Sequence, residues 1–211
     1  TSADEVMRGL DDLIRSGKVH YIGISDTPAW VISRANMLAE LRGWSQFAAL
    51  QIEYSLLQRG AERDLLPMAQ ALDMAVTPWG VIGGGALTGK YLRGEGGRVP
   101  ENSLRRNERS REIAQEVVDI AQELEVTPTQ IAINWARQRV SNVMPVIGAK
   151  RVEQLQDSLK CLDFTIPDTL MNRLNEISKI ELGFPHDFLS SEGVKQSAFA
   201  GTYDQIINHR L

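Results

Sequence analysis

Side chains that could hold a ligand stand at the ends of four apolar runs in this 211-residue chain. They are Ser25 and Asp26 at the first run, Gln51 at the second, Trp79 at the third, and Lys150 and Arg151 after the fourth. An amide forms hydrogen bonds with another amide, an indole ring stacks on flat groups, and cations attract phosphate. Each residue type also has a structural alternative.

The stretch TPWGVIGGGALTGKY, residues 77–91, is rich in glycine and continues the third run. It is not a P-loop, since that motif needs Ser or Thr after the lysine, and here Tyr91 follows Lys90. It also lacks the GxGxxG spacing of a dinucleotide loop that opens a helix. Three successive glycines, 83–85, are equally typical of a turn or a bulge. The loop by itself therefore leaves a ligand and a plain turn both open.

Two of the other positions are harder to explain as structure alone. An amide such as Gln51 in a central strand must find partners or cost roughly 1–3 kcal/mol. Lys150 and Arg151 precede an expected helix, where cations oppose the helix dipole and a bound phosphate would relieve the conflict. By contrast, the Ser-Asp pair could simply cap the next helix, and a tryptophan is more often part of a core.

If the strands run parallel, the four positions lie at the same edge of the sheet. Ligands bind at this edge, at the carboxyl ends of the strands. One strand end offers an amide, one an aromatic ring with a glycine loop, and one a basic helix start. A nicotinamide dinucleotide needs bonds to its carboxamide, a surface for its ring, N–H groups for its pyrophosphate and cations for a 2′-phosphate. The combination therefore favours such a cofactor.

Composition narrows the class of protein. Hydrophobic residues make up 43% and charged residues 24%, which is ordinary for a globular protein. The net charge of −4 disfavours a nucleic-acid-binding surface. No apolar run approaches the roughly 20 residues of a membrane span, and the acidic N-terminal segment is no secretory signal. The single cysteine, Cys161, fits a reducing compartment, so we expect a cytoplasmic location.

Helical and extended patterns alternate along the chain, which predicts βαβ units and a parallel sheet, covered on both faces or closed into a barrel. Four strands are expected, at 19–25, 47–53, 74–79 and 143–147. Helices are expected at 3–15, 28–41, 61–72, 108–124, 128–139, 151–162 and 165–178, with 80–107 as a loop. Thr27 is the expected N-cap of the second helix with Pro28 at its first position, and Thr127–Gln130 is an expected capping box.

Five segments together resemble the aldo-keto reductase family in sequence, order and spacing, from residue 3 to about 179. They are GKVHYIGISD, LQIEYSLL, TPWGVIGGGALTGKY, VTPTQIAINW and VIGAKRVEQLQDSL. The tail sequence FPHDFLSSEGV is similar to bacterial members near the potassium-channel β-subunit branch. The resemblance implies a (β/α)8 TIM barrel that reduces carbonyls with NADPH. This chain would hold its second half, about four strands, in residues 1–179, and a tail, 180–211, over the barrel mouth.

The resemblance also implies roles for matching positions. The carboxamide of the nicotinamide would contact Ser25, Asp26 and Gln51, and the nicotinamide ring would stack on Trp79. The pyrophosphate loop would comprise Gly80, Val81, Ile82, Gly83, Gly84 and Lys90. The adenosine phosphate and adenine would lie near Gly148, Lys150, Arg151, Gln154, Asp157 and Ser158. Three departures stand out: Asp26 and Ser158 replace the more usual Asn, and Gly-Val-Ile replaces Ser-Pro-Leu after the tryptophan.

The family's catalytic tetrad of Asp, Tyr, Lys and His has no counterpart here. Its members stand on the first four strands of the barrel, and the histidines of this chain are His20, His186 and His209. His20 falls at a strand start, the non-catalytic end of such a barrel. We therefore assign no catalytic residue and no metal ligand, and expect the 211-residue polypeptide alone to be inactive.

Four strands cannot close a barrel. Three explanations are open: a longer protein, a missing half supplied by a separate chain or a second copy, or a truncated product. The expected small-molecule partner is a carbonyl substrate of unknown identity, and the oligomeric state is undecided. A dinucleotide-binding regulatory subunit and an inactive remnant are the alternatives to an enzyme.

Overall fold

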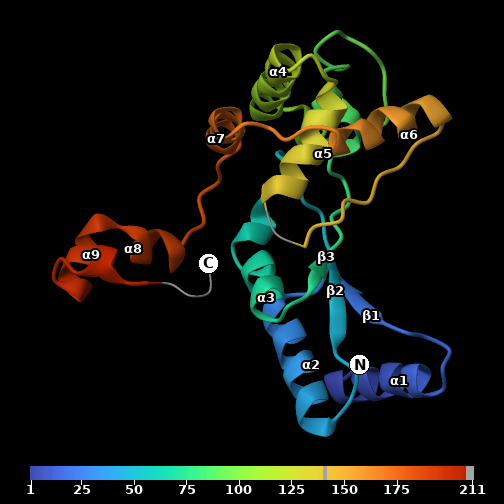
Figure 1. Ribbon diagram of the computed structural model, residues 1–211, viewed down its shortest axis with the longest axis vertical. Helices are drawn as coiled ribbons and strands as arrows, with labels where there is room; N and C mark the ends of the chain where they lie inside the picture. Colours follow the sequence, from blue (N-terminus) through green and yellow to red (C-terminus); the bar gives the residue numbers. More distant parts are fainter. Residues whose placement is uncertain (140–141, 208–211) are drawn as a thin grey trace. The chain divides into compact units, whose positions relative to one another are not determined.

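The computed structural model describes residues 1–139 and 142–207 and separates the chain into two compact units (Figure 1). The first comprises Thr1–Lys179 and the second Ile180–Leu211. The first unit contains the sheet and every residue discussed above as a candidate contact. The expected placement of the tail over a barrel mouth stays a prediction.

The first unit alternates strands and helices in the predicted order. Its strands are β1 (Ile22–Ser25), β2 (Phe47–Gln51) and β3 (Ala75–Val76). Its helices are α1 (Ala3–Arg15), α2 (Ala29–Arg42), α3 (Leu65–Ala71), α4 (Glu108–Glu123), α5 (Pro128–Arg139), α6 (Val152–Leu159) and α7 (Asp168–Ile177). Short 3-10 helices lie at Gly60–Glu62, Gly83–Thr88, Leu104–Arg106 and Lys160–Leu162. The sheet order is β1-β2-β3 with both pairs parallel, as the alternation predicts.

The fourth expected strand, 143–147, is reduced to a single parallel bridge between Val76 and Val143. Two backbone bonds continue the pairing, from the Met144 N–H to the Val76 carbonyl and from the Val146 N–H to the Pro78 carbonyl, each 2.8 Å. Pro78 lacks an N–H group, so β3 cannot donate to this segment beyond Val76 and the pairing loses a hydrogen bond. The prediction of a fourth full strand was therefore wrong in extent, although the segment lies where predicted.

The sheet has one buried and one accessible face, which differs from a sheet covered on both faces and leaves the alternative, part of a barrel. Leu50, Ile52 and Val76 point to the buried face, where α3 contacts β3. There the Asn36 amide of α2 binds both backbone groups of Phe47, accepting from its N–H at 2.9 Å and donating to its carbonyl at 3.3 Å. The opposite face, which carries Gly23, is exposed to solvent. We call it the open face.

Helix ends agree with the predicted start signals in one case and differ in another. α5 begins at Pro128, and the Gln130 N–H donates to the Thr127 hydroxyl at 3.4 Å, which is one of the two contacts of a capping box. The N-cap of α2 is Pro28 rather than Thr27. The Thr27 hydroxyl instead donates to the Ser25 carbonyl at 2.9 Å, which stabilises the turn before the helix.

The second unit consists of short helical elements. It contains α8 (His186–Ser190), α9 (Glu192–Phe199) and a 3-10 turn at Tyr203–Gln205. Its described residues include no buried side chain. Within the described residues of the whole chain, no helix is long and apolar enough to cross a bilayer.

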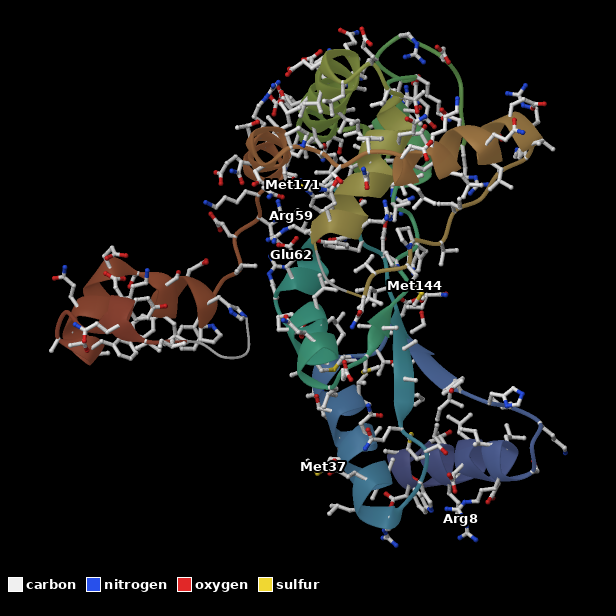
Figure 2. The ribbon with its side chains drawn as sticks, viewed as in Figure 1. Arg8, Met37, Arg59, Glu62, Met144 and Met171 are labelled. Atoms are coloured by element: carbon white, nitrogen blue, oxygen red, sulfur yellow. The ribbon has the colours of Figure 1, made fainter. Side chains whose placement is uncertain are left out.

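A buried ion pair joins the segment after β2 to α5 and α7. The Arg59 guanidinium donates to both oxygens of Glu62, at 2.8 and 2.9 Å, and its side chain is only 5% exposed. It also donates to the Asn175 carbonyl and the Ser178 hydroxyl of α7 and its cap, both at 2.8 Å. The Tyr54 hydroxyl donates to Glu62 at 2.7 Å. Figure 2 labels Arg59 and Glu62, which lie beside each other at the start of α3.

The protonation states in this cluster follow from its contacts. Burial and the hydrogen bond to Glu62 raise the pKa of Tyr54, so the phenol stays protonated. Burial opposes ionisation of Glu62, but the hydrogen bonds from Arg59 and Tyr54 outweigh it and hold its pKa below the usual value. The cluster therefore contains a carboxylate and a guanidinium whose charges stabilise each other out of water.

We expect Glu62→Gln to lower the free energy of unfolding by about 3 kcal/mol near neutral pH, because it leaves the buried Arg59 charge unpaired. Glu62 has a depressed pKa in the folded protein, so its contribution is present above the unfolded pKa of about 4.3 and is lost as the pH falls below it. The difference from wild type should therefore shrink below about pH 4. Urea unfolding followed by tryptophan fluorescence measures both effects.

The matched control for Glu62 is Glu176→Gln. Glu176 is exposed and pairs with Lys179 at 3.8 Å on the surface of α7 and its cap. Its removal should change stability by less than about 0.5 kcal/mol. Equal losses in the two variants would contradict a special role for the buried pair.

Candidate functional site

Pairing register places the predicted amide and hydroxyl beside each other. Ser25, the last residue of β1, is paired with Gln51, the last residue of β2. Paired residues in adjacent strands point to the same face of the sheet, and Leu50, next to Gln51, is buried on the other face. Ser25 and Gln51 therefore both lie on the open face, and both are exposed.

The exposure of Gln51 corrects one step of the sequence argument. We expected a central-strand amide to be buried and to need partners. In the structure the side chain faces solvent, and it makes no hydrogen bond to any other described residue. Its amide is therefore free to bind a ligand, but no burial penalty requires it to do so.

Trp79 also lies on the open face, just beyond the end of β3. Beyond the ends of β2 and β3 the chains pair once more, through a parallel bridge between Glu53 and Trp79. The Trp79 N–H donates to the Ile52 carbonyl at 2.8 Å, and the Trp79 carbonyl accepts from the Tyr54 N–H at 3.2 Å. Glu53 is two residues from Gln51, so alternation puts Gln51, Glu53 and Trp79 on one face. The indole is partly exposed there.

The glycine loop turns away from Trp79 through left-handed backbone. Gly80, Gly83 and Gly84 have φ angles of 71°, 59° and 66°. A Cβ on Gly83 would lie 2.8 Å from Leu57, and one on Gly84 would lie 3.0 Å from Val99. Both the backbone angles and the close packing require glycine at these positions.

Three predicted residues of the loop region lie in different surroundings. Val81 is buried in the core, and Ile82 is partly buried against it. Lys90 does not extend toward Gly80: its ammonium lies beside Gly85, where an added Cβ would be 2.7 Å away, and 4.8 Å from the centre of the Tyr91 ring. Val81 and Ile82 can thus offer a ligand their backbone, while the Lys90 ammonium lies against Gly85, Gly97 and the Tyr91 ring.

The basic helix start belongs to α6. Arg151 is the N-cap of this helix, and neither its side chain nor that of Lys150 is buried. The Gln154 side chain accepts from the Lys150 N–H at 2.8 Å, which fixes the turn. Gly148 is exposed just before it. The chain reaches this turn from Val146, whose N–H binds the Pro78 carbonyl next to Trp79.

Asp157 and Ser158, the expected adenine-facing pair, are turned toward protein. Asp157 accepts from the Thr127 hydroxyl at 3.1 Å and from the Gln130 amide at 2.7 Å, which ties α6 to the start of α5. The Ser158 hydroxyl donates to the Gln154 carbonyl within its own helix at 2.8 Å. In a capping box the Gln130 side chain would bind the backbone at the start of its own helix. Here it binds Asp157 instead.

Asp26 is exposed and adopts a left-handed conformation, with a φ angle of 47°. Asp and Asn tolerate this region better than most residues, which fits the more usual Asn at this position in the resembled family. The turn thus explains the residue type without a ligand. Of the histidines, His20 precedes β1, His186 begins α8 in the second unit, and His209 lies outside the described residues.

Sequence reasoning missed one pair at this site. Glu53, on the open face beside Trp79, forms an ion pair with Arg105, which lies in a 3-10 helix of the long loop. A single charged residue after a strand end gives little signal. Arg105 follows Glu53 by 52 positions, and the two residues meet only because the loop folds back to the sheet.

The family model for the aldo/keto reductase family matches residues 1–179, the whole of the first unit. The chain belongs to the aldo/keto reductase family. It is 34% identical over 199 residues to a protein described as a probable aryl-alcohol dehydrogenase of Saccharomyces cerevisiae, covering 91% of this chain and 60% of the relative. It is also 34% identical over 214 residues to an NADP(+) aryl-alcohol dehydrogenase of Phanerodontia chrysosporium, covering 96% and 55%.

Two further comparisons agree with this family. A norsolorinic acid reductase of Aspergillus flavus is 33% identical over 190 residues, with 90% of this chain and 48% of the relative covered. A crystal structure of a thermostable aldo-keto reductase with the inhibitor epalrestat shares the fold, with a TM-score of 0.65 and 20% identity over 84% of this chain and 55% of that one. This aldo/keto reductase chain thus spans about half the length of these relatives. The resemblance to the channel β-subunit branch stays a prediction.

We expect Asp157→Ala to lower the free energy of unfolding by about 1–3 kcal/mol, because the Gln130 amide, only 4% exposed, loses its partner. Thermal and urea unfolding measure the change. The control is Asp163→Ala, since Asp163 is exposed at the end of the same segment and should matter little. A neutral Asp157→Ala would contradict a stabilising role for these contacts.

Proposed function

We propose that this chain carries the cofactor-binding part of an NADP(H)-dependent carbonyl reductase or alcohol dehydrogenase. One observation supports this most strongly: the register of the sheet gathers an exposed hydroxyl, an exposed amide and an indole on one open face, next to a left-handed glycine loop. The relatives include an NADP(+) aryl-alcohol dehydrogenase and a norsolorinic acid reductase, which is consistent with this class of reaction.

Each group has a separate task in the proposed site. Ser25 and Gln51 bind the carboxamide of the nicotinamide, so that the ring lies against Trp79 with one face toward the substrate. The backbone from Gly80 to Gly84 approaches the pyrophosphate closely because no side chains intervene. NADPH, when bound, supplies the hydride; the residues of this chain orient the ring and exclude water from one side of it.

The proposed 2′-phosphate site is the start of α6. Lys150 and Arg151 are exposed there, and the first N–H groups of a helix favour an anion. Their charges explain a preference for NADPH over NADH, because only NADPH carries the additional phosphate. Location in the cytoplasm and a carbonyl substrate are part of the same proposal.

A dinucleotide-binding regulatory subunit is the second candidate. It is compatible with the same groups on the open face, because they could bind a dinucleotide without turning over a substrate. Carbonyl-dependent oxidation of NADPH, measured for this polypeptide and for the longest encoded form, separates the two candidates. Binding without turnover in both forms would favour the regulatory subunit.

NADPH should quench the tryptophan fluorescence of this chain, because the nicotinamide stacks on Trp79. Trp79→Phe should abolish most of the quenching, whereas Trp44→Phe should preserve it, since Trp44 lies between the end of α2 and the start of β2, at the opposite end of the strand from Gln51. A fluorescence titration measures both. No change in the wild-type signal at millimolar NADPH would argue against the proposed site.

Lys150→Ala should weaken NADPH binding roughly fivefold to tenfold and leave NADH binding nearly unchanged, because a charged contact to phosphate contributes about 1 kcal/mol or more. Lys160→Ala is the matched control, since Lys160 is an exposed lysine at the other end of the same helix. Dissociation constants for both cofactors decide the question. Equal losses for NADPH and NADH would place the 2′-phosphate elsewhere.

A further inference from the structure

Helix α2 carries apolar side chains on two faces. Its inner face, which includes Ile32 and Ala39, is buried in the core. Its outer face carries Trp30, Met37 and Leu41, which are 68%, 55% and 76% exposed. Exposed apolar patches mark sites of interaction with another molecule, and tryptophan is enriched at the centre of such sites.

The three exposed side chains lie on one line along the helix. Met37 follows Trp30 by seven residues and precedes Leu41 by four, and both spacings return to the same side of an α-helix. Figure 2 labels Met37, which lies on the side of α2 away from the sheet. We call this line of three residues the outer stripe.

The outer stripe is not part of an edge of the sheet. α2 connects β1 to β2 and contacts both α1 and α3. The sheet edges lie at β1 and at the segment 143–147, which is bridged to β3. Strands added at either edge would extend the sheet away from α2 and leave the outer stripe exposed. A partner for the stripe is therefore a separate matter from completion of a barrel.

Two charged residues flank the outer stripe symmetrically. Arg34 precedes Met37 by three residues and Glu40 follows it by three, so the three side chains form one row across the outer face. Both charged side chains are exposed, and neither forms a hydrogen bond or an ion pair with any described residue. The row therefore presents a positive, an apolar and a negative group, with both charges available to a partner.

We propose that the outer face of α2 binds the same face of a second copy of this chain, across a twofold axis beside Met37. An axis at right angles to the row reverses its direction, so Arg34 of each copy meets Glu40 of the other copy, and the two Met37 side chains meet at the axis. A twofold dimer requires a self-complementary surface of this kind. Rows of residues three apart run at roughly 45° to a helix axis, so the two α2 helices cross at roughly a right angle.

The size of the contact predicts its strength. Three apolar side chains from each copy supply only part of the roughly 1,200–2,000 Å² that a stable interface buries. Exposed ion pairs add little to this. The dimer should therefore be weak, with a Kd in the micromolar range, and should dissociate on dilution. It needs no cofactor, so the inference is independent of the proposed function.

An exchange of charges tests the pairing across the axis. Arg34→Glu replaces two opposite-charge contacts in the dimer by two like-charge contacts, so the Kd should rise roughly tenfold, and Glu40→Arg should have the same effect. The double variant with both substitutions restores two opposite-charge contacts, so its Kd should return to within about twofold of wild type. Sedimentation velocity of the full chain over a range of concentrations measures each Kd.

The matched control is Arg111→Glu, which makes the same change of charge at an exposed arginine of α4 and should leave the Kd unchanged. A wild-type chain that stays monomeric at millimolar concentration would overturn the proposal. A double variant as weak as the single variants would also overturn it, because the two charges would then not face each other. Equal Kd values in all variants would do so too, since association would then use another surface.

Met37→Lys tests the position of the axis. It places two ammonium groups against each other in the dimer, so the Kd should rise roughly tenfold or more. Met144, which is 56% exposed and lies outside α2, provides the control. Met144→Lys should leave the Kd unchanged, and an equal loss in the two lysine variants would count against an axis beside Met37.

Discussion

Parallel pairing in register is the constraint on which the candidate site depends. Ser25 pairs with Gln51, and Glu53 pairs with Trp79 across the next two strands. Because side chains alternate along a strand, a shift of one residue in either pairing would send these groups to the buried face. The buried side chains of Leu50, Ile52 and Val76 make such a shift costly, because it would bring Gln51 into the core. The hydrophobic core therefore determines the position of the polar groups.

Much of this arrangement could be predicted from the sequence. The order of strands and helices follows from apolar periodicity, and the polar groups at strand ends follow from the parallel topology. Features that depend on contacts between distant segments could not be predicted. Residues 143–147 look like a full strand until they are paired with β3, where Pro78 lacks the next donor. The exposure of Gln51 likewise depends on what covers the sheet.

The same limit explains the outcomes at the individual site residues. Lys90 was expected at the pyrophosphate, but its ammonium lies beside Gly85 and over the Tyr91 ring. Asp157 was expected to face adenine, yet Thr127 and Gln130 bind both of its oxygens. Motif spacing gives the neighbourhood of such residues, whereas the partner of each side chain is chosen by packing. Glu53 shows the converse, since an unremarked residue becomes part of the site through a contact 52 positions away.

Pro145, in the segment after Asn142, limits how a further strand can be added to this edge of the sheet. Met144 and Val146 direct their N–H groups toward β3, so the outward-facing donors of this segment belong to Val143, Pro145 and Ile147. The middle one is absent because proline has no N–H. A strand approaching this edge would find a gap in the ladder at its centre, which discourages indiscriminate strand addition and the aggregation that follows from it.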